Sequence, residues 1–187
     1  MIVVADTSPF VALTNIGRLD LLPRLFGRVL IPPQVLDELQ SSKRPGTVRA
    51  FAATPPEWLE VRAPMEVEPI PDLHVGETAA ISLARECHAE LLVIDETQGR
   101  KAAGDRGLTI TGTIGVLEAA AQRGLVRLEE EFERLKRMGF WVNPKLLDAR
   151  LAVFREGRHE PETAAGQDQG SQQPEEKERN HDRGHEQ

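Results

Sequence analysis

Glu90-Leu-Leu-Val-Ile-Asp95 carries the strongest buried-strand pattern in the chain, because four consecutive apolar residues lead directly into a carboxylate. A short, continuous apolar run of this kind is typical of a strand that is covered on both faces. Shorter runs with the same character occur on either side of it along the chain. They predict four further strands, at residues 2–5, 28–31, 58–62 and 108–110.

Helical patterns separate these strands. Pro32-Pro33 opens one helix, with proline in the first turn, where its missing N–H breaks no hydrogen bond. Asp72 or His74 would cap a long Ala-rich helix that runs to about Cys87, whereas the proline-rich residues 41–71 form the least regular part. The helix that Pro32-Pro33 opens is expected at residues 33–40. Further helices are expected at residues 9–16, 19–26, 98–106, 113–123, 128–138 and 144–154. The alternation predicts an α/β fold, a three-layer α/β/α sandwich with a mainly parallel central sheet.

Length and composition fit one domain of ordinary size. The chain has 187 residues, of which 40% are hydrophobic and 28% are charged. Cys87 is the one cysteine, which excludes an intramolecular disulfide and a thiolate metal cluster. Met1-Ile-Val-Val-Ala-Asp6 lacks the basic start of a signal peptide, and no run of 18 apolar residues is present. We therefore expect a soluble, cytoplasmic protein without a membrane segment.

The last part of the chain differs in composition from the rest. Residues 155–187 contain no Val, Ile, Leu, Met, Phe or Trp, and they carry nine acidic and five basic residues. Such a segment buries too little apolar surface to offset the conformational entropy of ordering it, so we predict a domain at 1–154 and a disordered charged tail at 155–187. The net charge of the whole chain is −7 and that of residues 1–154 is −3. Any nucleic-acid binding must therefore rest on a local site.

Two aspartates follow predicted strands directly. Asp6 comes after residues 2–5, and Asp95 comes after the run that ends at Ile94. The carboxyl ends of parallel strands meet at one edge of a sheet, where ligands bind, so both carboxylates are expected there. The alternative is that each aspartate merely caps the following helix, although Thr7 and Ser8 offer other caps next to Asp6.

Two glutamates lie close to apolar helix faces. Glu38 follows Val35 by three residues, and Glu77 shares a face with Ile81 and Ala84. A buried carboxylate usually becomes neutral or finds a cation, and a structural salt bridge from Glu77 to Arg85 or Arg49 is the alternative to a functional role. By contrast, Glu129, Glu130 and Glu131 are expected to form a solvated helix face.

The four acids Asp6, Glu38, Glu77 and Asp95 would meet in one pocket. Four ionised carboxylates repel one another unless a cation is present, and hard divalent ions prefer oxygen ligands. Mg²⁺ or Mn²⁺ held in this way activates water and stabilises the leaving oxygen of a phosphodiester. The pattern therefore predicts a metal-dependent hydrolase site, although the spacing of acids alone is weakly specific.

Five stretches in this order resemble the PIN domain, in a prokaryotic branch akin to toxin–antitoxin nucleases. They cover roughly residues 2–140 and predict the parallel sheet inferred above. The stretches are Val4-Ala-Asp-Thr-Ser-Pro-Phe-Val-Ala-Leu13, Val29-Leu-Ile-Pro-Pro-Gln-Val-Leu-Asp-Glu-Leu39, Gly76-Glu-Thr-Ala-Ala-Ile81, Leu91-Leu-Val-Ile-Asp-Glu-Thr-Gln-Gly-Arg100 and Thr111-Gly-Thr-Ile-Gly-Val-Leu117.

The resemblance implies metal-dependent endoribonuclease chemistry with Mg²⁺ or Mn²⁺. Asp6 matches the aspartate after the first strand, and Glu38 matches the helix glutamate. Glu77 matches the third acid, which is aspartate in many relatives. Asp95 matches the acid after the central strand, with the neighbouring Glu96 as a possible substitute, and this ambiguity leaves the number of metal ions open. Thr7 or Ser8 matches the hydroxyl that orients the first acid or a water on the metal.

The residues that would contact substrate are less distinctive. Arg100 and Lys101 follow Asp95 on the next helix and would meet phosphate groups, and the backbone of Thr111-Gly112-Thr113 would cradle a phosphate at a helix start. The alternative is an ordinary basic helix face and an ordinary cap, and we favour that interpretation for Arg106. The chain has no Tyr, two Trp and six Phe, so aromatic platforms for single-stranded bases are scarce.

The sequence thus favours a ribonuclease, the toxin of a toxin–antitoxin pair, with RNA as substrate and a small antitoxin protein as partner. The first alternative is a PIN-fold binding or regulatory module with little or no nuclease activity. A metal-dependent phosphatase fits less well, because the Asp-x-Asp signature expected after the first strand is absent and Asp6 is followed by Thr7 and Ser8. A homodimer is expected through part of the apolar C-terminal region, which comprises Leu125, Val126, Leu128, Phe132, Leu135, Met138, Phe140 and Trp141.

Overall fold

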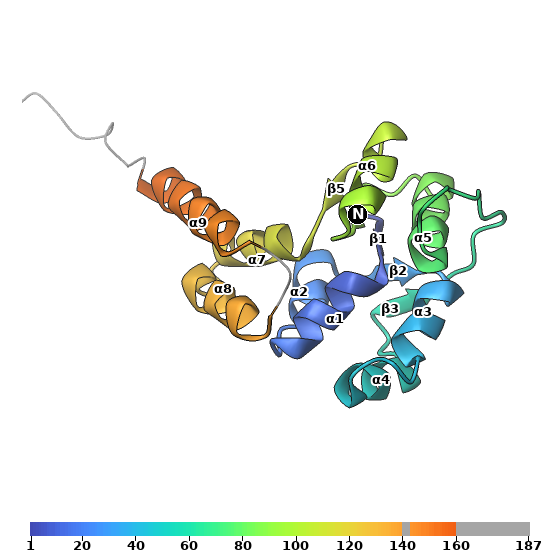
Figure 1. The fold of residues 1–187 in the computed structure, drawn as a ribbon, viewed down its shortest axis with the longest axis horizontal. Coiled ribbons are helices and arrows are strands. Elements are labelled where there is room, and N and C mark those ends of the chain that lie inside the picture. The colour runs from blue at the N-terminus through green and yellow to red at the C-terminus, as the bar shows by residue number, and fades with distance from the viewer. Residues whose placement is uncertain (140–142, 160–187) are drawn as a thin grey trace, which may run out of the picture.

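The computed structural model describes residues 1–139 and 143–159, and its centre is a parallel sheet (Figure 1). Within these residues all the strand pairings are parallel, which confirms the predicted α/β class. The strand order is β3-β2-β1-β4-β5. The strands are β1 (Val3–Ala5), β2 (Val29–Ile31), β3 (Leu59–Val61), β4 (Leu91–Val93) and β5 (Ile110–Thr111).

The first strand lies in the middle of the sheet. Val4 pairs with Leu30 of β2 on one side, and Ala5 pairs with Val93 of β4 on the other. Because the strands run in the same direction, β1 and β4 end at the same edge. This register brings the residues that follow them, Asp6 and Asp95, to that edge, as the sequence predicts.

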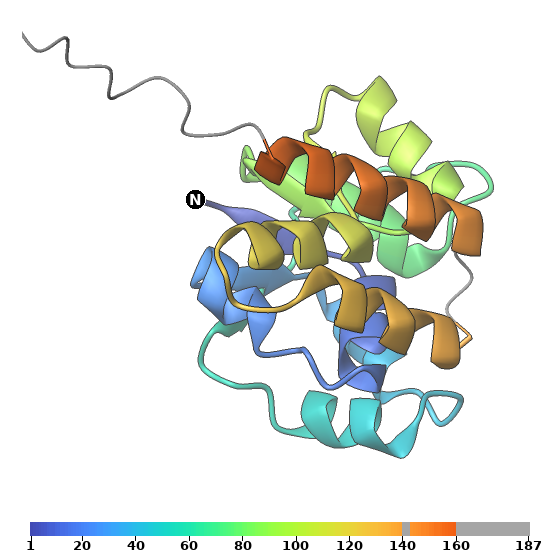
Figure 2. The ribbon, with the colours of Figure 1, turned by 90° about the vertical axis from the view of Figure 1, so that its left-hand side faces the viewer.

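Helices cover both faces of the sheet, as the predicted three-layer sandwich requires (Figure 1). On one side lie α1 (Thr7–Asn15), α2 (Leu21–Phe26) and α7 (Thr113–Gln122), and on the other lie α5 (Val75–Glu86) and α6 (Thr97–Asp105). In addition, α3 (Pro33–Gln40) packs against α1, α5 and α4 (Gly46–Ala53), while α8 (Leu128–Arg137) and α9 (Pro144–His159) stack outside α7 (Figure 2). None of the helices in the described ranges is long and apolar enough to span a bilayer.

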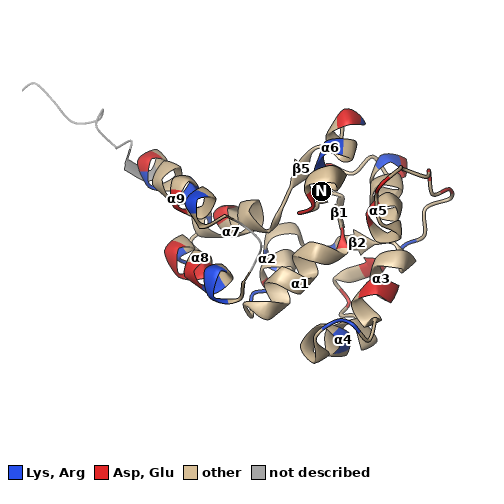
Figure 3. Cartoon of the chain, viewed as in Figure 1, with Lys and Arg blue, Asp and Glu red and all other residues tan. Residues whose placement is uncertain are grey.

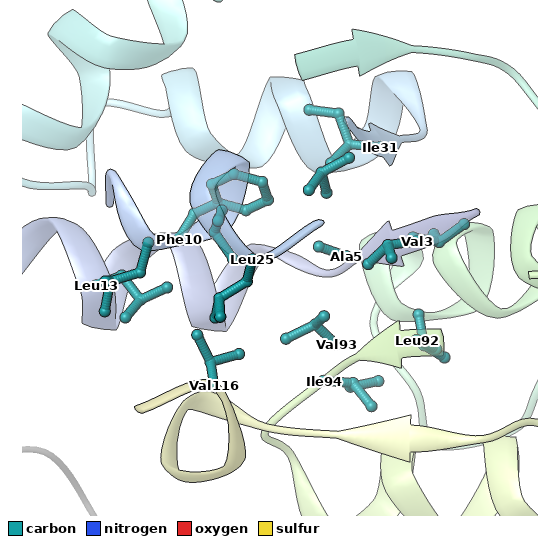
Figure 4. Packing of buried hydrophobic residues seen from close by; sticks show 14 of the residues in the cluster. Val3, Ala5, Phe10, Leu13, Leu25, Ile31, Leu92, Val93, Ile94 and Val116 are labelled. Carbon is teal, nitrogen blue, oxygen red and sulfur yellow. The ribbon is translucent and has the colours of Figure 1, made fainter. Parts of the chain in front are cut away.

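The core fills the space between the sheet and its helices. Val3 and Ala5 of β1 are completely buried, and so are Leu92 and Val93 of β4 (Figure 4). Strands that are buried on both faces read as continuous apolar runs, which explains why these segments were recognisable from sequence. On the α1 side, Phe10 stacks on Phe51, with ring centroids 5.8 Å apart, and attaches α4 to the core.

Two helices differ from the sequence prediction. Helix α4 lies within the segment expected to be irregular, and it forms because Val48 and Ala52, four residues apart, are both fully buried. Helix α9 continues to His159, five residues beyond the predicted domain end at 154. Arg155, in this extension, donates to Glu129 Oε1 of α8 at 3.2 Å. The predicted disordered tail, 155–187, is therefore wrong for residues 155–159, which belong to α9, and its remainder, 160–187, lies outside the described residues.

The expectation that Glu131 belongs to a solvated helix face is wrong. Its side chain is buried, and Arg18 Nε and Nη2, from the α1–α2 connection, both lie 2.9 Å from Glu131 Oε1. Arg134 Nη1 lies 3.7 Å from the other carboxylate oxygen. The charge pattern of a helix does not predict which of its turns packs against another element. Here the partner, Arg18, lies 113 residues from Glu131 in the sequence.

Candidate active site

Asp6 lies at the carboxyl edge of the sheet and caps α1. Its Oδ2 accepts from the Ser8 hydroxyl at 3.1 Å and from the Ser8 backbone N–H at 3.5 Å. The residue is only 2% exposed, and Oδ1 is buried without any hydrogen-bond partner among the described residues. An ordinary capping aspartate has no need of such burial, so one oxygen of Asp6 remains available for a ligand.

Other acids surround Asp6 closely enough to affect its ionisation. Burial raises the pKa of Asp6 to about 7, a hydrogen bond from the Thr7 backbone lowers it, and the charges of Glu77 and Glu38 raise it further. The like charges show that the structure brings these three predicted acids together. Asp6 is therefore only partly ionised near pH 7, and a bound cation would favour its charged form.

Glu38 of α3 is fixed by hydrogen bonds from two other elements. Thr7 Oγ1 donates to Glu38 Oε2 at 2.6 Å, and the Gly76 backbone N–H donates to Oε1 at 2.9 Å. The two hydroxyls predicted to support the first acid thus divide their roles, because Ser8 holds Asp6 and Thr7 holds Glu38. Arg44 approaches from solvent, with Nη2 3.9 Å from Glu38 Oε2.

Glu77 lies in the first turn of α5 and is 5% exposed. Its Oε2 accepts from the His74 backbone N–H at 3.0 Å, whereas Oε1 is buried without a partner among the described residues. Burial raises the pKa of Glu77, and the His74 hydrogen bond opposes this, while the charges of Glu96 and Glu38 add to it. The alternative salt bridge with Arg85 is not formed, because Arg85 pairs with Glu68.

Asp95 and Glu96 lie in different surroundings. Both oxygens of Asp95 accept hydrogen bonds from Thr113, at 2.7 Å from the backbone N–H and 2.6 Å from the hydroxyl. Burial raises the pKa of Asp95, and the Thr113 bonds and the nearby Arg100 oppose this rise. Glu96 is the N-cap residue of α6, and its side chain makes no hydrogen bond or ion pair within residues 1–139 and 143–159.

Glycines next to the acids are site residues that sequence reasoning missed. A Cβ atom on Gly76 would lie 2.5 Å from Glu38 Oε1, and one on Gly99 would lie 2.8 Å from Glu77 Oε1. Neither glycine needs a positive φ, so no turn signal marks them in the sequence. Their role is to let a carboxylate approach the backbone of a helix closely.

The residues present are suited to a divalent cation, although the carboxylates are not yet gathered around one point. Among the described residues, no group of three or more His, Cys, Asp or Glu side chains is arranged to hold a metal ion. The reason is that Glu38 and Asp95 direct their oxygens into hydrogen bonds with Thr7, Gly76 and Thr113. Asp6 and Glu77, however, each keep one buried oxygen without a partner, which is the donor chemistry that Mg²⁺ and Mn²⁺ require.

A cleft of about 670 Å³ begins beside these acids and runs between α1, α6, α7, α8 and α9. Ser8, Asp95 and Glu96 line its acidic end, and Arg44, Arg100 and Arg150 add positive charge along it. Of the predicted substrate residues, Arg100 and Thr111 line the cleft, whereas Lys101 is exposed and pairs with Asp105. Apolar residues of α1, α7, α8 and α9 complete the walls, namely Val11, Ile16, Ile114, Leu135, Met138 and Leu146.

Arg106 faces away from this cleft. It donates to the Ala102 carbonyl at 3.1 Å, pairs with Glu68, and lines a separate groove with Arg85 and His88. The ordinary interpretation favoured for Arg106 from sequence agrees with this placement. Figure 3 shows Lys and Arg spread over several elements and interspersed with Asp and Glu. The arginines of the cleft therefore do not belong to a large basic surface.

Comparison with known proteins agrees with the α/β fold. Searches of curated proteins and of solved structures gave no significant match. A family model described as a PIN domain matches residues 2–156, which includes every strand of the sheet and all the acids described above. The chain therefore belongs to the PIN-domain family, a family of nucleases.

Proposed function

We propose that this protein is a metal-dependent endoribonuclease that uses Mg²⁺ or Mn²⁺ to hydrolyse RNA phosphodiesters. The observation that carries the proposal is the pair of buried, unpartnered carboxylate oxygens, Asp6 Oδ1 and Glu77 Oε1, in a PIN domain. Leaving two such oxygens unsatisfied costs folding free energy, about 1–3 kcal/mol for each buried polar group. A cation bound by the two oxygens would offset this free-energy cost, which explains why the oxygens are left without hydrogen-bond partners in the protein.

Asp6 and Glu77 would hold the ion, with Glu38 and an acid of the Asp95–Glu96 pair as further oxygen donors. When bound, Mg²⁺ or Mn²⁺ supplies the activation of a water molecule and stabilises the leaving oxygen of a phosphodiester. Ser8 orients Asp6 so that Oδ1 stays free, and Thr7 with Gly76 orients Glu38.

The arginines of the cleft would bind the substrate backbone. Arg100 donates one N–H to the Ile94 carbonyl at 2.9 Å, which fixes its guanidinium beside the acids and leaves other donors for a phosphate oxygen. Arg44 also lines the cleft and lies 3.9 Å from Glu38 Oε2, whereas Arg150 is engaged by Glu118 at 2.7 Å. Arg100 and Arg44 are therefore the candidates for phosphate contacts.

The finer proposal is that the nuclease is the toxin of a toxin–antitoxin pair, restrained by a small antitoxin protein. It rests on the resemblance of the five sequence stretches to that branch of PIN domains. Expression of the protein alone should arrest growth, and co-expression of the protein encoded next to its gene should restore it. Growth that continues normally while active nuclease accumulates would contradict the toxin role and leave the nuclease proposal intact.

The decisive experiment is cleavage of a structured RNA by the full chain with Mn²⁺, with Mg²⁺ and with a chelator. Asp6→Asn keeps the size of the side chain and one acceptor oxygen but removes the charge that binds the ion. Metal ions contribute several kcal/mol of transition-state stabilisation, and a loss of about 3 kcal/mol slows cleavage by roughly a hundredfold. We therefore expect Asp6→Asn to lose at least that much activity while its melting temperature is unchanged or higher.

Asp37→Asn is the matched control, because Asp37 is an exposed acid next to Glu38 on α3, and its side chain makes no hydrogen bond or ion pair with the described part of the chain. It should cleave RNA at the wild-type rate, whereas Glu38→Gln should be impaired. Wild-type cleavage by Asp6→Asn in Mn²⁺ would refute the assignment of this site. If the wild-type chain cleaves no RNA with either ion, the alternative of a PIN-fold binding module replaces the nuclease proposal.

A further inference from the structure

Asp95 and Glu96 are adjacent acids at the end of β4, yet only one of them has free oxygens. Asp95 accepts from the Thr113 backbone N–H at 2.7 Å and from the Thr113 hydroxyl at 2.6 Å, so each of its oxygens holds one bond. Thr113 is fully buried and is the first residue of α7. The carboxylate of Asp95 therefore serves the start of a helix that lies 18 residues further along the chain.

The residue before α7 explains why Asp95 is needed there. Gly112 is the N-cap residue of this helix and has no side chain to accept from the first turn. A Cβ atom on Gly112 would lie only 2.6 Å from Asp95 Oδ1, so the carboxylate occupies the place of the missing capping side chain. An oxygen at this position satisfies backbone N–H groups that the helix itself leaves unpaired.

Glu96 has the opposite character. Within residues 1–139 and 143–159 its side chain makes no hydrogen bond or ion pair, and it lines the acidic end of the cleft. The unpartnered Oε1 of Glu77 faces the first turn of α6, 2.8 Å from the Cβ position of Gly99. Glu96 occupies the N-cap position of the same helix without making a side-chain capping bond. Among the charged neighbours that affect the pKa of Glu77, Glu96 has the largest effect, larger than that of Glu38.

We infer that Glu96, and not Asp95, is the fourth carboxylate of the acid site, and that Asp95 is a positioning residue that caps α7 and fixes the Gly112–Thr113 edge of the cleft. The inference rests on the proposed function for the role of Glu96 but not for that of Asp95. It assigns different chemistry to two neighbours of the same charge. The buried Asp6 Oδ1 and Glu77 Oε1, on which the proposed function also rests, point to a cation at this end of the sheet.

The test compares Asp95→Asn with Glu96→Gln in the full chain, and it measures Mn²⁺ binding by calorimetry without RNA. Asparagine keeps Oδ1 as the acceptor for the Thr113 N–H, and its amide can donate to the Thr113 hydroxyl. We therefore expect Asp95→Asn, which keeps both bonds to Thr113, to bind Mn²⁺ within about threefold of wild type. Glu96→Gln should bind at least about tenfold more weakly, because loss of even a group that only supports a ligand weakens metal binding by about 10–100-fold. Glu57→Gln, at an exposed acid, controls for the general loss of negative charge.

A second measurement tests the cap alone, by thermal unfolding of the metal-free protein. Asp95→Ala and Thr113→Val should each lower the melting temperature by about 2–6 °C, the usual effect of losing a cap in a domain of this size. The double variant should lose no more than Asp95→Ala alone, because Asp95→Ala already removes the hydroxyl bond that Thr113→Val removes, together with the backbone N–H bond. Glu96→Ala should leave the melting temperature unchanged or raise it.

The outcomes separate this inference from the proposed function. Loss of Mn²⁺ binding in Asp95→Asn would make Asp95 a ligand and overturn the inference, whatever Glu96→Gln does. Wild-type Mn²⁺ binding in Glu96→Gln would overturn the assignment of Glu96 as the fourth carboxylate of the acid site. If the wild-type chain binds neither Mn²⁺ nor Mg²⁺, the proposed function fails together with the role of Glu96, and additive losses of melting temperature in the double variant would then refute the capping role as well.

Discussion

A single buried carboxyl group, Asp6, connects the stability of the fold to pH. Its pKa is raised to about 7 in the folded protein, mainly by burial, against 3.8 for an ordinary aspartate. The folded state therefore holds one more proton than the unfolded state between these two values, and stability contributed by Asp6 is lost as the pH rises through this window. Above pH 7 the destabilisation is constant, so the metal-free protein should be more stable at pH 5 than at pH 8.

Asp6→Asn isolates this effect, because Glu77 and Asp95 have raised pKa values too and contribute in both proteins. Between pH 5 and pH 8 the wild-type protein should lose about 3 kcal/mol more unfolding free energy than the variant, from 1.36 kcal/mol for each pKa unit. Urea unfolding at both pH values in the presence of a chelator measures the difference. Parallel pH profiles for the two proteins would show that Asp6 is ionised without cost in the fold.

The buried ion pair between Arg18 and Glu131 predicts a second single-residue effect. Arg18→Ala leaves the Glu131 carboxylate buried, with Arg134 at 3.7 Å as its one remaining cationic neighbour among the described residues. This change should destabilise the protein by about 2–4 kcal/mol. Arg24→Ala is the matched control, since Arg24 pairs with Asp20 at the surface and should change stability by less than about 1 kcal/mol. Equal denaturation midpoints for the two variants would contradict this difference.

At the scale of a single element, α6 contains two glycines with opposite surroundings. A Cβ atom on Gly99 would lie 2.6 Å from Ile94 Cδ1 and 2.8 Å from Glu77 Oε1, whereas nothing lies within 4 Å of the Cβ position of Gly104. Gly104→Ala should therefore raise stability by up to about 1 kcal/mol through helix propensity. Gly99→Ala should lower stability and weaken Mn²⁺ binding, because it displaces Glu77. Thermal unfolding and calorimetry of both variants check this contrast, and equal effects would refute the close packing.

The elements also show what a sequence can reveal. The apolar runs of β1 and β4 were recognisable because a strand buried on both faces needs apolar residues throughout, and the edge position of Asp6 and Asp95 followed from parallel pairing. Which carboxylate oxygens accept hydrogen bonds could not be predicted from the sequence, because the donors are distant in it. Thr113 lies 18 residues from Asp95, and Gly76 lies 38 residues from Glu38. Helix α4 was missed because its packing on α3 and the Phe10–Phe51 stack depend on tertiary contacts.

At the scale of the whole molecule, the apolar C-terminal region turns out to be mostly core. Leu128, Phe132 and Leu135 are buried, whereas Phe140 and Trp141 lie outside the described residues. Exposed apolar side chains remain at Met138, Leu146 and Val153. We predict a homodimer through this surface of α8 and α9, and light scattering at tens of micromolar should give twice the chain mass. Val153→Asp should shift the mass toward the monomer, and Val61→Asp, on β3, should not; a monomeric wild type would exclude the dimer.

The central position of β1 has a consequence for synthesis on the ribosome. Val3 pairs with Leu91, so the strand made first obtains its second neighbour only after 88 further residues have been added. Glu77, whose charge acts on Asp6, and Gly99, which lies beside Glu77, come from segments translated later, and Thr113 comes later still. With non-local parallel pairing of this kind, folding waits for the last partner strand. A nascent chain that stops short of β4 therefore has Asp6 but no assembled acid site, so any activity of that site begins only after most of the domain has emerged.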